Sequence, residues 1–142
     1  MSAIDTMANE GGWDPEYKPI LWARFRDDIY IPWTHGLDKL NAFHTWLNFC
    51  LPGIKFTMTT PSSHGTEFLD TFIYMNNFEL HTKPYSKDCD EHTFLVPSSC
   101  HPTHNLKNIP YSIAHRIHRI ASENEEYEKS KTEYSNYLRA RG

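Results

Sequence analysis

Two short apolar runs near the start of the chain flank the polar segment Arg26-Asp27-Asp28. Apolar, β-prone runs on either side of a charged turn predict a β-hairpin over residues 20–33, with the two acids at its tip. Pro32 has no N–H to donate to a sheet. The second strand is therefore expected to end there or to lie at an edge.

The apolar positions after the hairpin change to helical spacing. They recur at steps of three or four residues: Leu37, Leu40, Phe43, Leu47 and Cys50. This spacing puts them on one face of an amphipathic helix over residues 37–50, and Pro52-Gly53 is expected to close that helix.

Strand-like runs return after the helix. They cover residues 54–60, 68–75 and 78–82. Asn76-Asn77 lies between the last two runs and is a typical two-residue turn, which predicts a second hairpin. Residues 83–97 show no regular apolar pattern and are expected to be irregular.

The C-terminal part of the chain is predicted to form two helices. Pro110 suits the first turn of the first helix, where its missing N–H is tolerated, and Asn108 is a candidate N-cap. The apolar stripe of this helix is Ile113, Ile117 and Ile120. The segment Ser122-Glu123-Asn124-Glu125 has the form of a capping box that opens the second helix, and Gly142 suits its end. The second stripe is weaker: Tyr127, Tyr134 and Leu138.

Together these elements predict an α+β fold. It should consist of a β-hairpin and a small antiparallel sheet with a packing helix, followed by a helical region. With 142 residues, the chain is long enough for one domain with a hydrophobic core. We expect a flexible lead-in over residues 1–19, which glycine and proline interrupt, a β-rich segment over residues 20–97 and a helical segment over residues 98–142.

Charge is distributed unevenly along the helical segment. The formal net charge of the whole chain is −4, which argues against a uniformly basic nucleic-acid binder. Residues 101–120, however, contain Lys107, Arg116, Arg119 and four histidines but no acid, whereas residues 123–133 contain five glutamates and two lysines. A polyanionic partner should therefore contact the first stretch and avoid the second.

Two further features concern the cellular compartment. No apolar run approaches the roughly 20 residues of a membrane span, and the N-terminal residues lack the pattern of a secretory signal. The cysteines are odd in number, which favours reduced thiols: Cys50, Cys89 and Cys100. We expect a nuclear or cytoplasmic protein that is not secreted and has no membrane partner.

Asp27 and Asp28 are candidate metal ligands. Adjacent carboxylates repel each other, and a divalent cation with a preference for oxygen ligands, Mg²⁺ or Mn²⁺, relieves that repulsion. Two-metal phosphoryl transfer uses such acids to hold the ions that activate a 3′ oxygen and stabilise the leaving pyrophosphate. The alternative is a solvated turn without any ligand.

The tetrapeptide Phe25-Arg26-Asp27-Asp28 between two β runs resembles the catalytic hairpin of reverse transcriptases. The resemblance continues in order over residues 18–142 to the reverse transcriptases of Penelope-like and related animal retroelements. The matching segments are residues 21–29, 33–36, 54–57 and 67–70, Thr82-Lys83-Pro84, Ser99-Cys100-His101-Pro102, Asn108-Ile109-Pro110-Tyr111-Ser112 and residues 116–120.

This resemblance implies that residues 20–97 are part of a polymerase palm. It also implies that residues 98–142 begin the thumb, a region that some classifications describe as helix-turn-helix-like. Asp27 and Asp28 would be the catalytic ligands of Mg²⁺ or Mn²⁺. Lys55 falls near the palm lysine that assists the leaving pyrophosphate, although a solvated lysine at a strand start explains it equally well.

The resemblance also implies a nucleic-acid partner, an RNA or DNA primer–template duplex. Thr82 to Lys87 falls where the family grips the primer strand, and the terminal helices fall on the thumb. The side chains expected to contact phosphates are Lys83, Lys87, Lys107, Arg116 and Arg119.

Three features predict that this chain does not polymerise alone. A complete site needs fingers and an upstream palm aspartate, whereas Asp5 and Asp14 lie in polar sequence broken by glycine and proline. Arg26 stands where the family has a small or apolar residue, and a guanidinium there competes with metal for the two acids. Pro32 interrupts a strand that the family leaves unbroken. We therefore expect a truncated copy.

A cluster of thiols and imidazoles invites a zinc interpretation. It comprises Cys89, His92, Cys100, His101 and His104. These are enough ligands for a tetrahedral site, but their spacing is not that of a standard zinc finger. We expect these side chains to pack or face solvent instead.

The alternative to a polymerase fragment is a non-catalytic nucleic-acid-binding or interaction module whose working part is the terminal helices. It needs Lys107, Arg116 and Arg119 but no metal. His115 and His118 lie on the same helix and either approach nucleic acid or form its solvated side.

Overall fold

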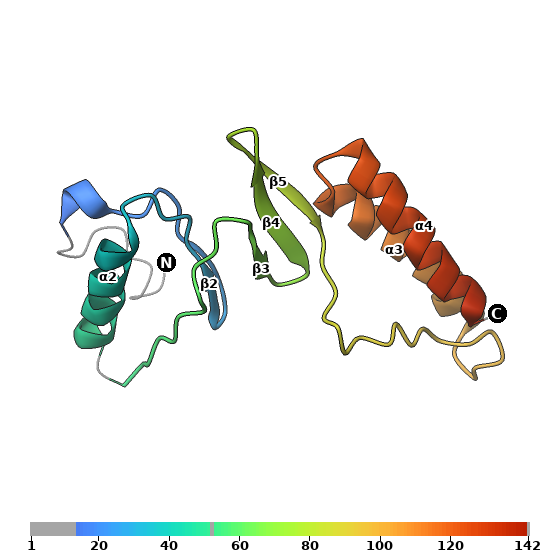
Figure 1. Cartoon of the computed structure of the whole chain (residues 1–142). Helices are drawn as coiled ribbons and strands as arrows, with labels where there is room; N and C mark the ends of the chain where they lie inside the picture. The colour runs from blue at the N-terminus through green and yellow to red at the C-terminus, as the bar shows by residue number, and fades with distance from the viewer. Residues whose placement is uncertain (1–13, 52, 142) are drawn as a thin grey trace. The chain divides into compact units, whose positions relative to one another are not determined.

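The α+β class expected from the sequence is confirmed. The computed structural model describes residues 14–51 and 53–141, and this part contains three α-helices and two antiparallel sheets (Figure 1). The elements are η1 (Pro15–Tyr17), β1 (Ala23–Phe25), β2 (Asp28–Tyr30), α2 (Leu37–Cys50), β3 (Thr66–Phe68), β4 (Thr71–Asn76), β5 (Glu79–Pro84), α3 (Thr103–Ile120) and α4 (Asn124–Ala140). They divide into two compact units, Met1–Pro61 and Ser62–Gly142. Most of the predicted lead-in and the helix end predicted at Gly142 lie outside the described residues.

In the first unit, β1 and β2 form the predicted hairpin in a shortened form. The strands pair antiparallel, with Ala23 opposite Tyr30 and Phe25 opposite Asp28. Strand β2 ends two residues before Pro32, which has no N–H to continue the ladder. The proline therefore limits the strand, as expected.

Helix α2 has the predicted bounds and packs through its predicted apolar face. Phe43, at 1% exposed, and Leu47 are buried. The Phe43 ring stacks on Trp33 and Trp46, with centroids 5.2 and 5.7 Å away, and meets Trp22 edge-on at 6.4 Å. An aromatic cluster is therefore the core of this unit.

The strand predicted over residues 54–60 is wrong, because this segment has no strand partner in the described chain. Side chains of α2 satisfy its backbone instead. The N–H of Phe56 donates to Asn48 Oδ1 at 2.8 Å, and the Phe56 carbonyl accepts from His44 Nε2 at 2.8 Å. The β-prone composition of residues 54–60 predicted a strand, but side chains of α2 take backbone hydrogen bonds that a neighbouring strand would make.

The second unit begins with a three-stranded sheet in the order β3-β4-β5. The predicted turn Asn76-Asn77 is shifted by one residue: Asn76 pairs with Glu79, and Asn77 and Phe78 form the turn. Both turn residues have positive φ, 48° and 66°, as type I′ hairpins require. A second turn at Leu69-Asp70 divides the run that was predicted to be one strand.

Cross-strand contacts account for the shifted register. In the observed pairing Tyr74 lies opposite His81, with stacked rings 5.7 Å apart, and Phe72 lies opposite Lys83. With the turn at Asn76-Asn77, Tyr74 would lie opposite Glu79 and Phe72 opposite His81, so both pairs would be lost. The turn position follows from these pairs, even though Phe78 is then left fully exposed.

The two predicted C-terminal helices are present, but the predicted start of the first is wrong. Helix α3 begins at Thr103 after Pro102, and Pro110 lies inside it. Asn108 is therefore not its N-cap. Buried Ile117, from the predicted stripe, offsets the hydrogen bond that the proline removes from the helix interior. No helix in the described residues is both long and apolar enough to cross a membrane.

Ser122 ties the turn between α3 and α4 to the edge of the sheet. Its N–H donates to the Thr82 carbonyl at 3.0 Å, and the Thr82 N–H donates to Ser122 Oγ at 3.0 Å. The Thr82 hydroxyl donates to the Ile120 carbonyl. The predicted capping box is thus wrong: Ser122 caps no N–H of α4, whose N-cap is Glu123. Ser122 instead forms hydrogen bonds with the free edge of β5 at Thr82.

Candidate nucleic-acid interface

The hairpin acids lie at the tip of the β1–β2 turn. Asp27 is in the turn and Asp28 is the first residue of β2, and both are exposed. Arg26 has a φ of 55°, and its guanidinium carbon lies 5.6 Å from the Phe25 ring centroid. Among the described residues, Arg26 makes no ion pair with either acid, so both carboxylates remain accessible to a cation.

Lys55 lies in the same unit as these acids, on the irregular segment after α2, and is exposed. In the described part of the chain no group of three or more histidine, cysteine, aspartate or glutamate side chains has a metal-binding arrangement. Asp27 and Asp28 therefore supply suitable oxygen ligands for Mg²⁺ but only two of them.

Two of the histidines considered for zinc, His92 and His101, have other contacts. His92 stacks on Tyr137 at 4.1 Å and lies 3.4 Å from Asp90 Oδ2, while His101 Nδ1 bonds to Ser99 Oγ. Cys89 and Cys100 are free and exposed.

One face of α3 gathers polar and basic side chains around a shallow hollow of about 570 Å³. Five residues of α3 that line it lie on adjacent helical turns: Tyr111, Ser112, His115, Arg116 and Arg119. This set, which we call the α3 face, lies largely opposite the stripe that carries buried Ile117. Tyr111 is 72% exposed, and its ring is tilted against that of His115 at 6.2 Å. An exposed ring beside two guanidiniums suits contact with nucleic acid.

Arg116 is the residue of the α3 face that is already paired. Its Nε lies 2.7 Å from Asp70 Oδ2, in the turn between β3 and β4, and both side chains are about half exposed. This contact could not be predicted from the sequence, because the two residues are distant in the chain. A phosphate that approaches Arg116 must compete with the Asp70 carboxylate.

Lys83 is half-buried and contacts an acid and two rings of its own unit. Its Nζ is 3.9 Å from Glu126 Oε1 and 5.5 Å from the ring centroids of both Phe72 and Tyr74. Partial burial, followed by the nearby Glu126, Glu123 and Glu125 carboxylates, raises the pKa of the Tyr74 hydroxyl above its ordinary value. The surroundings of Lys83 are therefore acidic.

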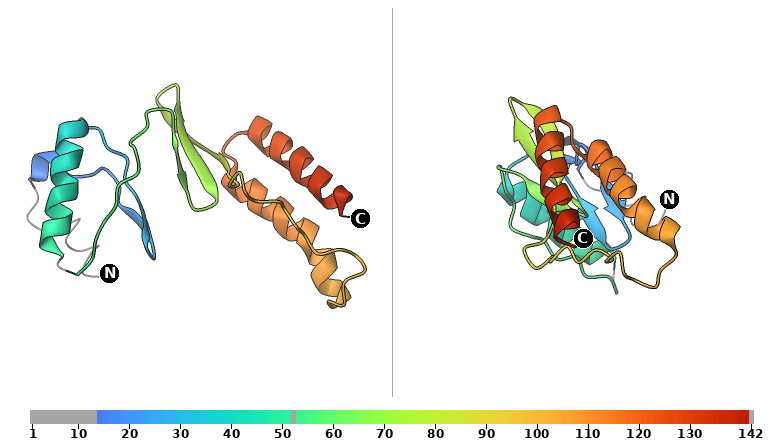
Figure 2. Two further views of the ribbon diagram at one scale, coloured as in Figure 1. Left: turned by 60° about the horizontal axis from the view of Figure 1, so that its bottom comes forward. Right: turned by 90° about the vertical axis from the view of Figure 1, so that its right-hand side faces the viewer.

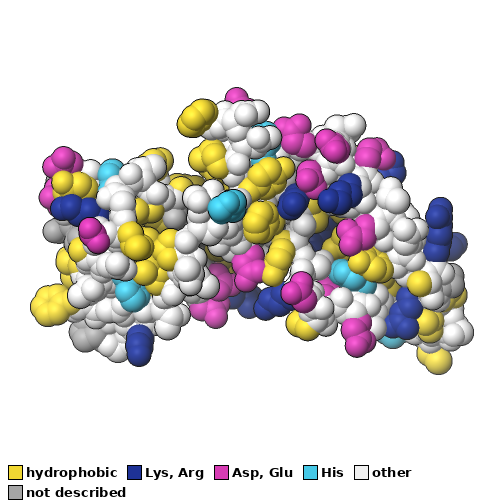
Figure 3. Space-filling view, viewed as in Figure 1, with side chains coloured by type: hydrophobic (Ala, Val, Ile, Leu, Met, Phe, Trp, Pro, Cys, Tyr) yellow, Lys and Arg dark blue, Asp and Glu magenta, His cyan; other side chains and the backbone are white. Residues whose placement is uncertain are grey.

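The remaining three predicted contacts are exposed: Lys87 on the connection after β5, and Lys107 and Arg119 on α3. Within the described residues none of the three forms an ion pair. Acidic side chains gather over the start of α4 (Figure 3). The structure thus brings Arg116 and Arg119 together on one face of α3, whereas Lys83 lies on β5.

Helices α3 and α4 lie side by side and run antiparallel, joined by a three-residue turn (Figures 1 and 2). Helix-turn-helix motifs that insert a recognition helix into the major groove cross at about 90–120°. The antiparallel arrangement instead exposes α3 along its length, which suits phosphate contacts better than base readout.

The family model described as the animal helix-turn-helix domain matches residues 93–142. This match covers α3, α4 and the end of the connection that precedes them. Comparison with curated proteins and with solved structures gives no match for the chain.

Proposed function

We propose that the second unit is a nucleic-acid-binding module and that the α3 face is its contact surface. The observation that carries this proposal is the gathering of Tyr111, Arg116 and Arg119 on one acid-free helix. The helix-turn-helix family match over residues 93–142 supports it independently. Lys107, earlier on the same helix, extends the basic stretch.

Binding should depend on phosphates rather than on base sequence. Lys87, Lys107 and Arg119 are exposed cations without an ion pair in the described chain, whereas Lys83 and Arg116 are paired with acids. Neutralisation of three phosphates gives a slope of log K against log salt concentration of about −3 on a duplex. The acidic surface of α4 should not contribute.

Arg119→Ala is the first test. The substitution should shallow the salt slope by about one unit and weaken binding to all sequences alike, because one phosphate contact is lost. Titration of a labelled DNA hairpin at several salt concentrations measures both effects. Lys129→Ala removes the same charge from the exposed surface of acidic α4 and should leave the slope unchanged. Salt-independent binding, or equal slopes for the parent and Arg119→Ala, contradicts the proposed surface.

A second candidate function is that of a fragment of a retroelement reverse transcriptase. The observation in its favour is the β1–β2 hairpin, which presents Asp27 and Asp28 at its turn, with Arg26 between them and Phe25. In that role the two acids would bind Mg²⁺, Lys55 would assist the leaving pyrophosphate and the α3 face would hold the primer–template duplex. Both candidates use the same helix for nucleic acid, and they differ in their need for the metal.

Primer extension tests whether the second candidate is active by itself. We expect the chain alone to show no template-dependent nucleotide incorporation with Mg²⁺ or Mn²⁺. Positioning and charge neutralisation supply most of the rate of phosphoryl transfer, and two exposed carboxylates supply little of either. A gel assay on RNA and DNA templates measures this. Incorporation that disappears in Asp27→Asn would contradict the expectation and establish the polymerase role.

A further inference from the structure

A second cavity lies behind the α3 face. It encloses about 510 Å³ and is lined by the turn after β3, the end of β5 with the connection that follows it, and both C-terminal helices. Its volume is in the range of about 300–1,000 Å³ that small-molecule sites occupy. Asp70 and Arg116 line both this cavity and the hollow of the α3 face, so the two adjoin at the Asp70–Arg116 ion pair.

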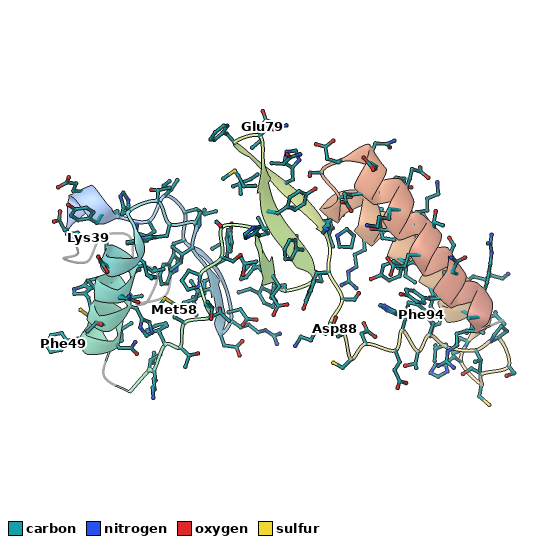
Figure 4. The ribbon with its side chains drawn as sticks, viewed as in Figure 1. Lys39, Phe49, Met58, Glu79, Asp88 and Phe94 are labelled. Carbon is teal, nitrogen blue, oxygen red and sulfur yellow. The ribbon has the colours of Figure 1, made fainter. Side chains whose placement is uncertain are left out.

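The walls of this cavity combine aromatic rings with hydroxyl groups. Tyr85, Phe94 and Tyr134 supply the rings, and Phe94 lies on the connection beside the helices (Figure 4). Ser86 Oγ and Tyr134 OH lie 3.0 Å apart at the wall. The nearby Glu67 carboxylate raises the pKa of the Tyr85 hydroxyl above its ordinary value. A flat aromatic ligand with a polar edge suits such walls.

The charges around the cavity leave one cation available. Asp70 pairs with Arg116, and Asp90 accepts from the N–H of His92 at 2.9 Å, so both carboxylates at the wall have protein partners. Lys87 also lines the cavity, and no ion pair engages it within the described chain. The wall carries two acids and two bases, and Lys87 is the base left to bind the phosphate of a ligand.

We propose that this cavity binds one unpaired nucleotide of a nucleic acid held on the α3 face, with the base between the aromatic walls and the adjacent phosphate at Lys87 and Arg116. This inference rests on the proposed function and names its substrate class more closely. A phosphate bound to Arg116 weakens the ion pair between Arg116 and Asp70. This ion pair lies where the hollow of the α3 face adjoins the cavity. Stacking of a base on protein rings favours unpaired nucleotides of any sequence.

The test compares three labelled DNA hairpins with the unmodified chain at one salt concentration. One is blunt, one has a single unpaired 3′ nucleotide and one has an abasic nucleotide at that place. The unpaired nucleotide should tighten binding about tenfold relative to the blunt hairpin, since one base stacked on aromatic side chains contributes on this order. The abasic nucleotide keeps the phosphate and should lose most of that gain.

Phe94→Ala removes one wall of the cavity but no member of the α3 face. It should abolish the preference for the unpaired base and leave the affinity for the blunt hairpin unchanged. Equal affinity of the unmodified chain for all three hairpins would overturn the cavity proposal while leaving the α3 face intact. Binding of the unpaired hairpin alone would overturn the α3 face, and with it the proposal that this face holds the nucleic acid whose nucleotide enters the cavity. The absence of binding to all three would overturn both.

Discussion

Replacing Phe43 with alanine is expected to lower the free energy of unfolding of the first unit by about 3–5 kcal/mol, the usual cost of removing a buried ring. Phe43 is 1% exposed and lies against the rings of Trp22, Trp33 and Trp46. The substitution removes these contacts and leaves a cavity that rigid indole rings fill poorly.

Tryptophan fluorescence during urea denaturation reports this effect selectively, because all four tryptophans of the chain lie within residues 1–61. Phe49→Ala is the matched control. Phe49 lies on the same helix but is 84% exposed, so its loss should change stability by no more than about 0.5 kcal/mol. Equal shifts for the two variants would mean that Phe43 is not the core residue of this unit.

Local patterns predicted the elements whose contacts are local. The steps of three and four residues gave the bounds of α2 because one apolar face, with Phe43 and Leu47, meets the aromatic cluster. The position of Asp27 and Asp28 at the turn of the first hairpin was predicted because a charged segment separates two apolar runs. In both cases the residues that decide the structure are neighbours in the sequence.

Elements that depend on distant partners were predicted less well. Residues 54–60 have the composition of a strand, but a strand also needs a neighbour, and Asn48 takes its backbone hydrogen bonds instead. Ser122 has the sequence of a helix cap, yet its hydroxyl bonds to β5. The Thr82 N–H competes with the first N–H groups of α4 for the Ser122 hydroxyl. No residue near Ser122 in the sequence indicates this distant partner.

The candidate site shows the same division. The acid-free stretch of α3 pointed to the helix that carries the α3 face, because helical periodicity places Arg116 and Arg119 on adjacent turns. The sequence could not show that Asp70 engages Arg116 or that Glu126 engages Lys83. Tyr111 was not identified as a surface residue, although an aromatic side chain three positions past Asn108 and off the isoleucine stripe was a usable signal.

Ile117→Ala is expected to have the largest effect in the second unit, a loss of about 2–5 kcal/mol in the free energy of unfolding. Ile117 is 3% exposed and lies in the helix whose C-terminal end is bonded to β5 through Thr82. Its removal leaves a cavity where α3 meets the rest of the unit.

Far-UV circular dichroism during thermal unfolding measures the change, because α3 and α4 contribute 18 and 17 helical residues against 14 in α2. Ile20→Ala makes the same chemical change at a side chain that is 72% exposed and should have little effect.

The same variant links stability to binding. Ile117 lines the cavity but is not part of the α3 face, so Ile117→Ala should lower apparent affinity for a blunt DNA hairpin only to the extent that the unit is unfolded. Cooling toward the temperature of greatest stability should restore binding close to that of the parent, and saturating hairpin should raise the unfolding temperature. Lost affinity at a temperature where circular dichroism shows both helices intact would mean that Ile117 acts on the binding surface directly, contrary to its burial opposite that surface.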